Sequence, residues 1–226
     1  MPVPKNNNTT KKLSIKDKIY LTMREWIIEG VLTPGERLLE DELCEHFNVS
    51  RTPIREAIQL LEIHDFVRIF PGRGTIVSNM DYGSVRSCYQ PLMVLQKLAA
   101  ELACDNITNE QMEQLKKLNA AFRKSKAVGD IKPIINADDA FHNAILHIAG
   151  NESIINFSAI LCSHIRRAEY QFVEATKENQ QNILAHEEII AALGQRDKEK
   201  AGHFMFENWR QTMVFFEDIL LKLRNP

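Results

Sequence analysis

The chain has 226 residues, of which 44% are hydrophobic and 26% are charged, and its formal net charge is −2. Such a composition is typical of a globular protein and fits one large domain or two small ones. A near-neutral chain has no bulk attraction to nucleic acid, so any DNA-binding region must concentrate its positive charge locally. No run of about eighteen apolar residues is present, so no membrane-spanning helix is expected.

The first twelve residues and the cysteines bear on localisation. Residues 1–12 lack the apolar stretch of a signal peptide and are expected to form a disordered polar tail. No two cysteines have C-x-x-C spacing, and this usage suits a reducing cytoplasm in which each thiol is a small buried hydrophobe. These residues are Cys44, Cys88, Cys104 and Cys162. We therefore expect a cytoplasmic protein.

Short segments separated by Pro and Gly fill the first third of the chain. The stretch SIKDKIYLTMREWIIEG predicts a helix in which Ser14 and Asp17 form a capping box and Gly30 ends the helix. LTPGERL predicts a turn. EDELCEHF then predicts a short helix that Asn48 closes, and its acidic first turn suits the helix dipole.

Another short helix and a hairpin follow closely. SRTPIREAIQLLEIH predicts a helix with Ser50 as its cap and Pro53 in its first turn, where a missing N–H costs little. The runs FVRIF and TIVS flank PGRG, a pattern that predicts a β-hairpin with Arg73 at its tip. Three helices and a hairpin in this order predict a winged helix-turn-helix. Arg73 would then reach a minor groove or the DNA backbone.

The start of the second helix in the motif has the chemistry of a DNA-reading surface. In a helix-turn-helix this end lies in the major groove, and here it carries Arg51, Thr52 and Arg55. Arg51 and Arg55 are four residues apart and share a face, and a guanidinium can bind guanine O6 and N7 together or clamp a phosphate. Alternatively, both arginines are solvated and pair with Glu56 or Glu62 of the same helix.

The segment PGERLLEDELCEHFNVSRTPIREAIQLLEIHDFVRIFPGRGTIV resembles the winged helix of the GntR superfamily. The resemblance covers roughly residues 14–78. Two positions depart from the family pattern: Leu39 stands where relatives often have a polar helix cap, and Cys44 replaces a common alanine. The absent cap should cost about 1 kcal/mol. By resemblance, the DNA contacts are Ser50, Arg51, Thr52, Arg55 and Arg73.

From residue 81 onward the pattern predicts six helices and no strand. Thr108 and Gln111 form a second capping box, and Gly129, Gly150 and Gly194 are expected to end helices. The expected helices cover residues 82–104, 109–127, 132–149, 152–176, 180–193 and 197–223. With the hairpin as the only predicted sheet, the fold class is mostly α: an N-terminal winged helix-turn-helix plus a C-terminal all-α bundle.

One polar pair lies beside an apolar helix stripe. Within NADDAFHNAILHIAG, Asp138 and His142 are four residues apart and therefore share a face. A buried hydrogen-bonded pair, half of a metal site and part of a catalytic site would all fit this spacing.

Three segments, DDAFHNAILHIAGN, AHEEIIAAL and DKEKAGHFMFENWRQT, resemble the all-α FCD effector domain of FadR-type regulators. The resemblance implies a divalent metal, held by an Asp and a His four apart and two later His, with an organic acid as effector. Carried over, the ligands are Asp138, His142 and His186, with Asn208 where relatives have a fourth ligand, His. Asn208 could coordinate through its oxygen, His164 could compensate, or the pocket could bind its effector without metal.

Other features of this domain are less specific. His164 and Arg167 are predicted effector contacts, the arginine because it could pair a carboxylate; the alternatives are a core histidine and a surface arginine. The ligand set does not distinguish Zn, Ni, Mn and Fe. Pro91 lies inside the first helix of the domain and should kink it.

These observations predict a DNA-binding transcription regulator. Its parts are a tail (1–12), a winged helix-turn-helix domain (13–80) and an FCD effector-binding and dimerisation domain (81–226). We expect a homodimeric repressor on a palindromic operator, controlled by a small carboxylate effector at a divalent metal site. The alternatives are a regulator that senses the metal itself and a metal-free effector pocket.

Enzyme function is disfavoured by the absence of motifs. The stretch HEEII at His186 begins like the metalloprotease motif H-E-x-x-H, but Ile190 stands where its second histidine would be. No G-x-S-x-G, P-loop or G-x-G-x-x-G sequence occurs. The same histidines could serve a helical metallohydrolase, and turnover of small esters or peptides would reveal one.

Overall fold

The computed structural model describes residues 13–80, 82–171 and 182–224. Two compact units divide the chain, Met1–Asn79 and Met80–Pro226. The expected tail, residues 1–12, lies outside the described residues, and the domain limits 13–80 and 81–226 stay predictions. Among the described helices, none is long and apolar enough to cross a membrane.

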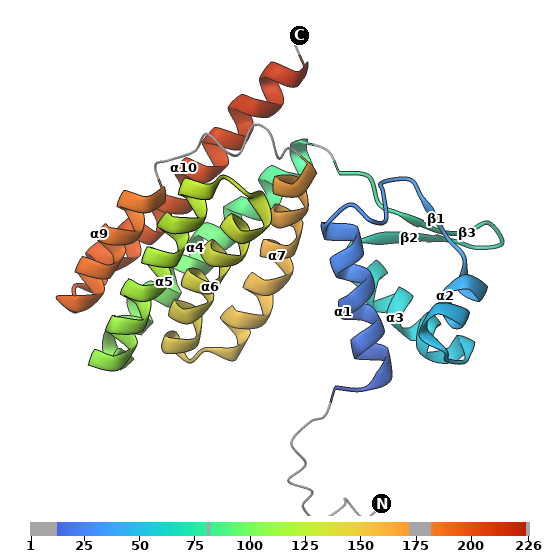
Figure 1. The fold of residues 1–226 in the computed structure, drawn as a ribbon, viewed down its shortest axis with the longest axis horizontal. Coiled ribbons are helices and arrows are strands. Elements are labelled where there is room, and N and C mark those ends of the chain that lie inside the picture. The colour runs from blue at the N-terminus through green and yellow to red at the C-terminus, as the bar shows by residue number, and fades with distance from the viewer. Residues whose placement is uncertain (1–12, 81, 172–181, 225–226) are drawn as a thin grey trace, which may run out of the picture. The chain divides into compact units, whose positions relative to one another are not determined.

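The N-terminal unit contains the predicted three helices and a small antiparallel sheet (Figure 1). Its elements are α1 (Ile15–Ile28), β1 (Arg37–Leu38), α2 (Glu40–Phe47), α3 (Arg51–Ile63), β2 (Val67–Phe70) and β3 (Gly74–Val77). The predicted hairpin is β2–β3, but the sheet has three strands in the order β1-β3-β2. The sequence predicted only a turn at β1, because two residues are too few to show strand periodicity.

Helix ends in this unit follow from local chemistry. The predicted capping box of α1 is present: the Asp17 backbone N–H donates to Ser14 Oγ, and the Ser14 N–H donates to the Asp17 carboxylate. Gly30 and Asn48 adopt left-handed φ values of 74° and 51° after α1 and α2. Leu39 is the N-cap of α2 and supplies no side-chain hydrogen bond, as predicted.

Ser50 is the N-cap residue of α3, but its side chain makes no cap hydrogen bond, so the predicted capping role is wrong in this respect. Residue type identifies a cap position and cannot fix the hydroxyl rotamer. One face of α3 is buried as expected for a helix of a small core. That face consists of Ile54, Ala57, Ile58 and Leu61.

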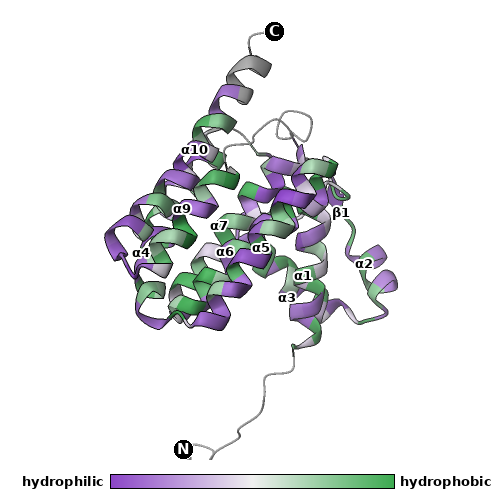
Figure 2. Ribbon diagram, turned by 60° about the vertical axis from the view of Figure 1, so that its left-hand side comes forward, coloured by the Kyte–Doolittle hydropathy of each residue, from purple (hydrophilic) through white to green (hydrophobic). Residues whose placement is uncertain are grey.

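The C-terminal unit is the predicted helical bundle. Its described elements are α4 (Tyr82–Asn106), α5 (Asn109–Val128), α6 (Ile131–Ala149), α7 (Glu152–Gln171), α9 (Asn182–Gly194) and α10 (Lys198–Arg224). The predicted helix ends at 172–176 and 180–181 fall outside the described residues. The central helix α4 packs against α6, α7, α9 and α10 (Figure 1). Helices of both units carry alternating hydrophobic and hydrophilic bands, as amphipathic helices do (Figure 2).

Helices in the bundle end at the three predicted glycines, but only two of these have the left-handed conformation. Gly129 and Gly150 are left-handed C-caps, and the Thr108 capping box is present. Gly194 is instead the last residue of α9, and the left-handed position belongs to Arg196, with φ of 54°. The Arg196 guanidinium donates to backbone carbonyls at the end of α4, which stabilises this conformation for a side chain that rarely adopts it.

Two further expectations concern the kink at Pro91 and the burial of the cysteines. Helix α4 continues on both sides of Pro91, and the kink expected there stays a prediction. All four cysteines are free thiols, but only Cys104 is buried. The other three are half-buried, and of these Cys88 and Cys162 pack against the core of the C-terminal unit.

Candidate nucleic-acid interface and candidate metal centre

The five predicted DNA contacts are all exposed side chains of the N-terminal unit. Ser50, Arg51, Thr52 and Arg55 occupy the start of α3. Arg73 lies in the tight turn between β2 and β3, where its backbone N–H donates to the carbonyl of Phe70 at 2.9 Å. An exposed helix start and an exposed hairpin turn are both geometrically available to a DNA duplex.

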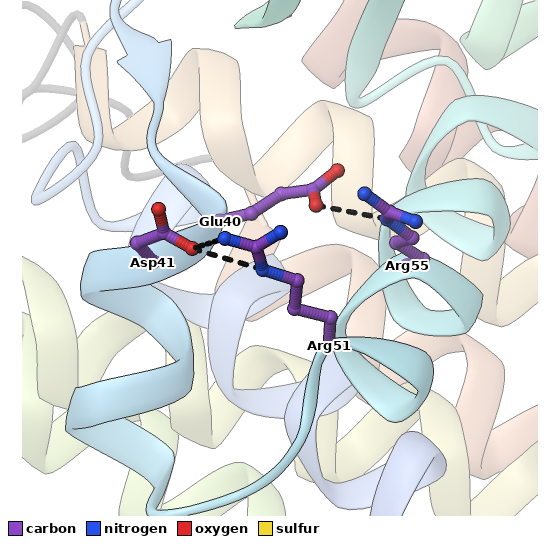
Figure 3. A network of polar contacts seen from close by, with 4 residues as sticks. All are labelled: Glu40, Asp41, Arg51 and Arg55. Atoms are coloured by element: carbon purple, nitrogen blue, oxygen red, sulfur yellow. Dashed lines mark hydrogen bonds and ion pairs between the residues drawn. The ribbon is translucent and has the colours of Figure 1, made fainter.

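The two arginines of α3 are ion-paired with the first turn of α2 (Figure 3). Arg51 donates from Nε and Nη2 to one oxygen of Asp41, at 3.1 and 2.7 Å. Arg55 donates from Nε to Glu40 at 2.8 Å. The pairing within α3 that sequence offered as an alternative is therefore not the arrangement found.

A second constellation is buried in the C-terminal unit. Asp138 and His142 on α6 meet His186 on α9, and their ligand atoms lie within 4.8 Å of one another. The Nε2 atom of His142 is 3.7 Å from Asp138 Oδ2, and the Nε2 atom of His186 is 3.4 Å from Asp138 Oδ1. Both histidines are buried and the carboxylate is partly exposed.

These separations can be compared with those of a hydrogen-bonded pair and of a metal site. A charge-assisted N–H···O bond is about 2.7–2.9 Å long, shorter than either contact. Ligands at about 2.0–2.2 Å from one metal ion lie roughly 3.0–3.6 Å apart. Asp138 Oδ1 and His186 Nε2 are buried and have no hydrogen-bond partner among the described residues. The His186–Asp138 separation falls within the range for two ligands of one ion, and the His142–Asp138 separation is slightly longer.

Burial sets the protonation of the cluster. It raises the pKa of Asp138 to about 7, with a smaller contribution from Asp139. It lowers the pKa of His142 to about 3. The pKa of His186 is also well below its usual range, mainly because of burial and then because of the neighbouring His142. Both imidazoles are therefore neutral near pH 7, the form in which a histidine binds metal.

Neighbouring helices hold the His186 ring in place. Its Nδ1 atom lies 3.2 Å from Oδ1 of Asn119 on α5. An amide oxygen only accepts, so Nδ1 carries the proton and the lone pair of Nε2 faces Asp138. The ring also stacks on Phe141, with centroids 3.9 Å apart.

The remaining predicted site residues lie in different surroundings. Asn208 on α10 is 2% exposed, and its Nδ2 atom has no hydrogen-bond partner among the described residues. Its neighbour Trp209 packs on His142, with ring centroids 4.7 Å apart. His164 is half-buried on α7 and is not part of the three-residue cluster. Arg167 is buried, and burial lowers its pKa to about 10.

A cavity of about 40 Å³ adjoins the cluster, because Asp138 is one of its lining residues. Lys126 and Thr212 contribute polar groups to the same wall, and most of the remaining lining is apolar. Glu169 also lines the cavity, and burial raises its pKa well above the usual range. The space would hold a few water molecules.

A winged helix with exposed arginines, followed in the same chain by a helical bundle with a buried Asp/His/His cluster, is the arrangement of a DNA-binding transcription regulator. Comparison with family models agrees. Residues 15–77 match the model for bacterial regulatory proteins of the gntR family, and residues 88–210 match the FCD domain. The chain belongs to the GntR family and carries an FCD domain.

Relatives and solved structures match most of the chain. A helix-turn-helix transcriptional regulator from an unstable DNA locus of Streptomyces ambofaciens is 28% identical over 206 residues, covering 89% of this chain and 83% of its own. The transcriptional repressor RspR of Escherichia coli is 25% identical over 197 residues, 87% and 86% of the two chains. The E. coli McbR/YncC structure has the same fold, with a TM-score of 0.80, 23% identity, and 92% and 99% coverage. The matched domains and relatives are transcription regulators and not enzymes.

Sequence reasoning missed the residues that support the predicted contacts. The roles of Glu40 and Asp41 could not be read from sequence, because their arginine partners lie on the next helix. The sequence contained only a weak indication that Asn119 supports the site. It falls on the inward stripe of α5 between Leu115 and Phe122, where a polar residue needs a buried partner.

Proposed function

We propose that the chain is a repressor that binds a palindromic operator as a homodimer, with Ser50, Arg51, Thr52, Arg55 and Arg73 as its DNA contacts. The observation that carries the DNA-reading part is the exposed pair Arg51 and Arg55 at the start of α3. Two half-sites related by two-fold symmetry match a two-fold symmetric protein. Occupation of the operator would block transcription.

Asp138, His142 and His186 are proposed to hold a divalent metal ion, with Asn208 as a further ligand through its amide oxygen. The 3.4 and 3.7 Å separations and the unpartnered ligand atoms support this assignment. A cation bound there would supply the positive charge that attracts an anionic effector. The neutral imidazoles and the Asn119 contact prepare the protein side of the site.

The effector is proposed to be a small carboxylate in the cavity beside Asp138. The half-buried ammonium group of Lys126 lines that cavity and can pair an anion. Unpartnered buried polar atoms on α4, at Tyr89 Oη and in the Gln96 amide, offer hydrogen bonds deeper in the unit. His164 and Arg167 remain predicted effector contacts. The effector must bind one arrangement of the protein better than another, since otherwise it shifts nothing.

Direct sensing of the metal is the second candidate. The observation in its favour is the small cavity, about 40 Å³, which leaves little room for an organic molecule. Chelation and metal addition would then change operator affinity, while no carboxylate added to the metal-loaded protein would change it further.

Homodimerisation is supported by apolar side chains on the surface of the C-terminal unit. Val94 on α4 is 59% exposed and Phe157 on α7 is 61% exposed. They line a common groove with Pro91, Leu95, Ile160 and Leu161. A contiguous apolar surface marks a protein contact, which we assign to a second copy.

The DNA-reading proposal is tested by selecting an operator. Duplexes are selected from a random-sequence library with the wild-type protein, and the affinity of the best one is measured for Arg51→Ala and Arg55→Ala. Each change should lower affinity by about fivefold to 150-fold, the cost of losing a bidentate base contact. Gln59→Ala, an exposed residue farther along α3, serves as control. Unchanged affinity in both arginine variants would contradict the assignment.

A further inference from the structure

The acidic first turn of α2 faces the arginines that are proposed to read DNA. Glu40, Asp41 and Glu42 are consecutive there, and two of the three bind guanidinium groups of α3 (Figure 3). Carboxylates at a surface that must meet phosphates oppose DNA binding. Their position therefore needs an explanation beyond charge balance.

A contribution of these ion pairs to the stability of the fold does not explain the position of the carboxylates. The side chains of Arg51 and Asp41 are 61% and 77% exposed, and those of Arg55 and Glu40 are 60% and 35% exposed. Ion pairs this exposed contribute little to the free energy of folding, because water screens them and ordering two long side chains costs entropy. The acids also complement the helix dipole, but Glu42 does so equally without contacting an arginine.

The two ion pairs involve only some of the guanidinium nitrogens. Asp41 accepts from Nε and Nη2 of Arg51 through a single oxygen. Glu40 accepts from Nε of Arg55. In both arginines Nη1 keeps its hydrogens, and Nη2 has at least one more to donate. The terminal Nη1 and Nη2 groups of each guanidinium therefore remain able to bind guanine O6 and N7 together.

We propose that Asp41 and Glu40 are specificity-determining residues of the operator-reading surface, each fixing the Nε edge of one arginine so that its terminal nitrogens meet a guanine. The same carboxylates repel the backbone of any duplex that offers no guanine at that position. Non-cognate DNA thus meets arginines whose positive charge is already paired with carboxylates, so its phosphates gain little attraction there. The proposal rests on Arg51 and Arg55 being DNA contacts.

The test compares affinities of the full chain for two duplexes, the selected operator and a shuffled duplex of equal composition. The variants Asp41→Asn and Glu40→Gln remove one charge each with little change of shape. Glu42→Gln removes the same charge from the same helical turn without touching an arginine and is the matched control. Thermal unfolding verifies that all variants fold.

The ratio of the two affinities is the decisive quantity. Asp41→Asn and Glu40→Gln should each reduce it by about fivefold or more, a loss within the discrimination that one bidentate arginine–guanine contact gives. Binding to the shuffled duplex should become tighter. Selection repeated with Asp41→Asn should show a weaker guanine preference at one position of each half-site.

Two results would overturn the proposal: a ratio within about twofold of wild type in both variants, or an equal fall in Glu42→Gln, which would indicate bulk charge alone. A failure of the specificity proposal can be distinguished from a failure of the proposed DNA contacts. If Arg51 and Arg55 did not contact DNA, Arg51→Ala and Arg55→Ala would leave operator affinity unchanged. Equal weakening on both duplexes leaves the ratio unchanged and likewise counts against a specificity role.

Discussion

Replacing Asn119 by Ala tests whether the His186 ring is held for metal binding. The amide oxygen lies 3.2 Å from Nδ1 of His186, and the side chain of His186 is fully buried. Without that acceptor, the proton is free to move to Nε2, the atom that faces Asp138, and the ring loses its fixed orientation. Loss of such a supporting contact typically lowers metal affinity by about 10–100-fold.

The same substitution should also lower stability. It leaves the buried N–H of His186 without a partner, which costs about 1–3 kcal/mol in the free energy of unfolding. Asn119→Asp retains an acceptor and should keep most of the metal affinity. Stability loss and affinity loss are therefore separable by comparing the two variants.

Affinity for Zn²⁺ or Ni²⁺ is measured by competition with a chromogenic chelator. Asn106→Ala is the matched control, because the Asn106 amide donates to the Ile148 carbonyl at 3.2 Å and has no contact with the cluster. It should destabilise the protein and leave metal affinity unchanged. The reasoning is refuted if Asn119→Ala binds metal as tightly as wild type, within about twofold, while losing as much stability as Asn106→Ala.

Three other predictions follow from particular residues. Leu39→Ser supplies the cap hydrogen bond that α2 lacks and should raise the free energy of unfolding of the N-terminal unit by about 1 kcal/mol. Urea denaturation measures this change, and no gain in the free energy of unfolding would show that the N-cap geometry is unsuitable. Burial, then repulsion by Arg24, lowers the pKa of His64 below 6.5, so the unfolded chain binds the proton more readily. The contribution of His64 to stability is present above pH 6.5 and declines as pH falls, and melting curves of His64→Gln should show a weaker acid-side loss than wild type; equal losses would contradict this. Phe157→Glu should convert a dimer to a monomer in sedimentation experiments, whereas an unchanged dimer would place the interface elsewhere.

The sequence was most informative where the chemistry is local. The capping box at Ser14 and the left-handed stop at Gly129 depend on a few consecutive residues, and both are present. Burial of His142 was also anticipated, because it lies beside an apolar stripe of its helix. The assignment of His142 and His186 as metal ligands came from family resemblance, since spacing alone left three options open.

Contacts between elements were beyond sequence reasoning. The sequence predicted Arg51 as a DNA contact and offered pairing with Glu56 or Glu62 of the same helix as the alternative, yet its partner Asp41 lies ten residues earlier on another helix. Periodicity also cannot say what covers an apolar face: Phe157 shares the helical spacing of Leu161 and Ala168, yet it is 61% exposed while Ala168 is fully buried. The hydroxyl of Ser50 shows the same limit, because a rotamer depends on the surrounding structure.

Coupling between the two sites is measured most directly as operator affinity at different occupancies of the buried cluster. Wild-type protein is compared after chelation, after metal loading, and after metal loading with a panel of small carboxylates, each alongside His142→Ala. We expect at least one of these states to change wild-type affinity by about fivefold or more, within the usual range for coupled sites, and His142→Ala to be insensitive. Identical wild-type affinity in all three states would contradict control of DNA binding by the Asp138–His142–His186 site.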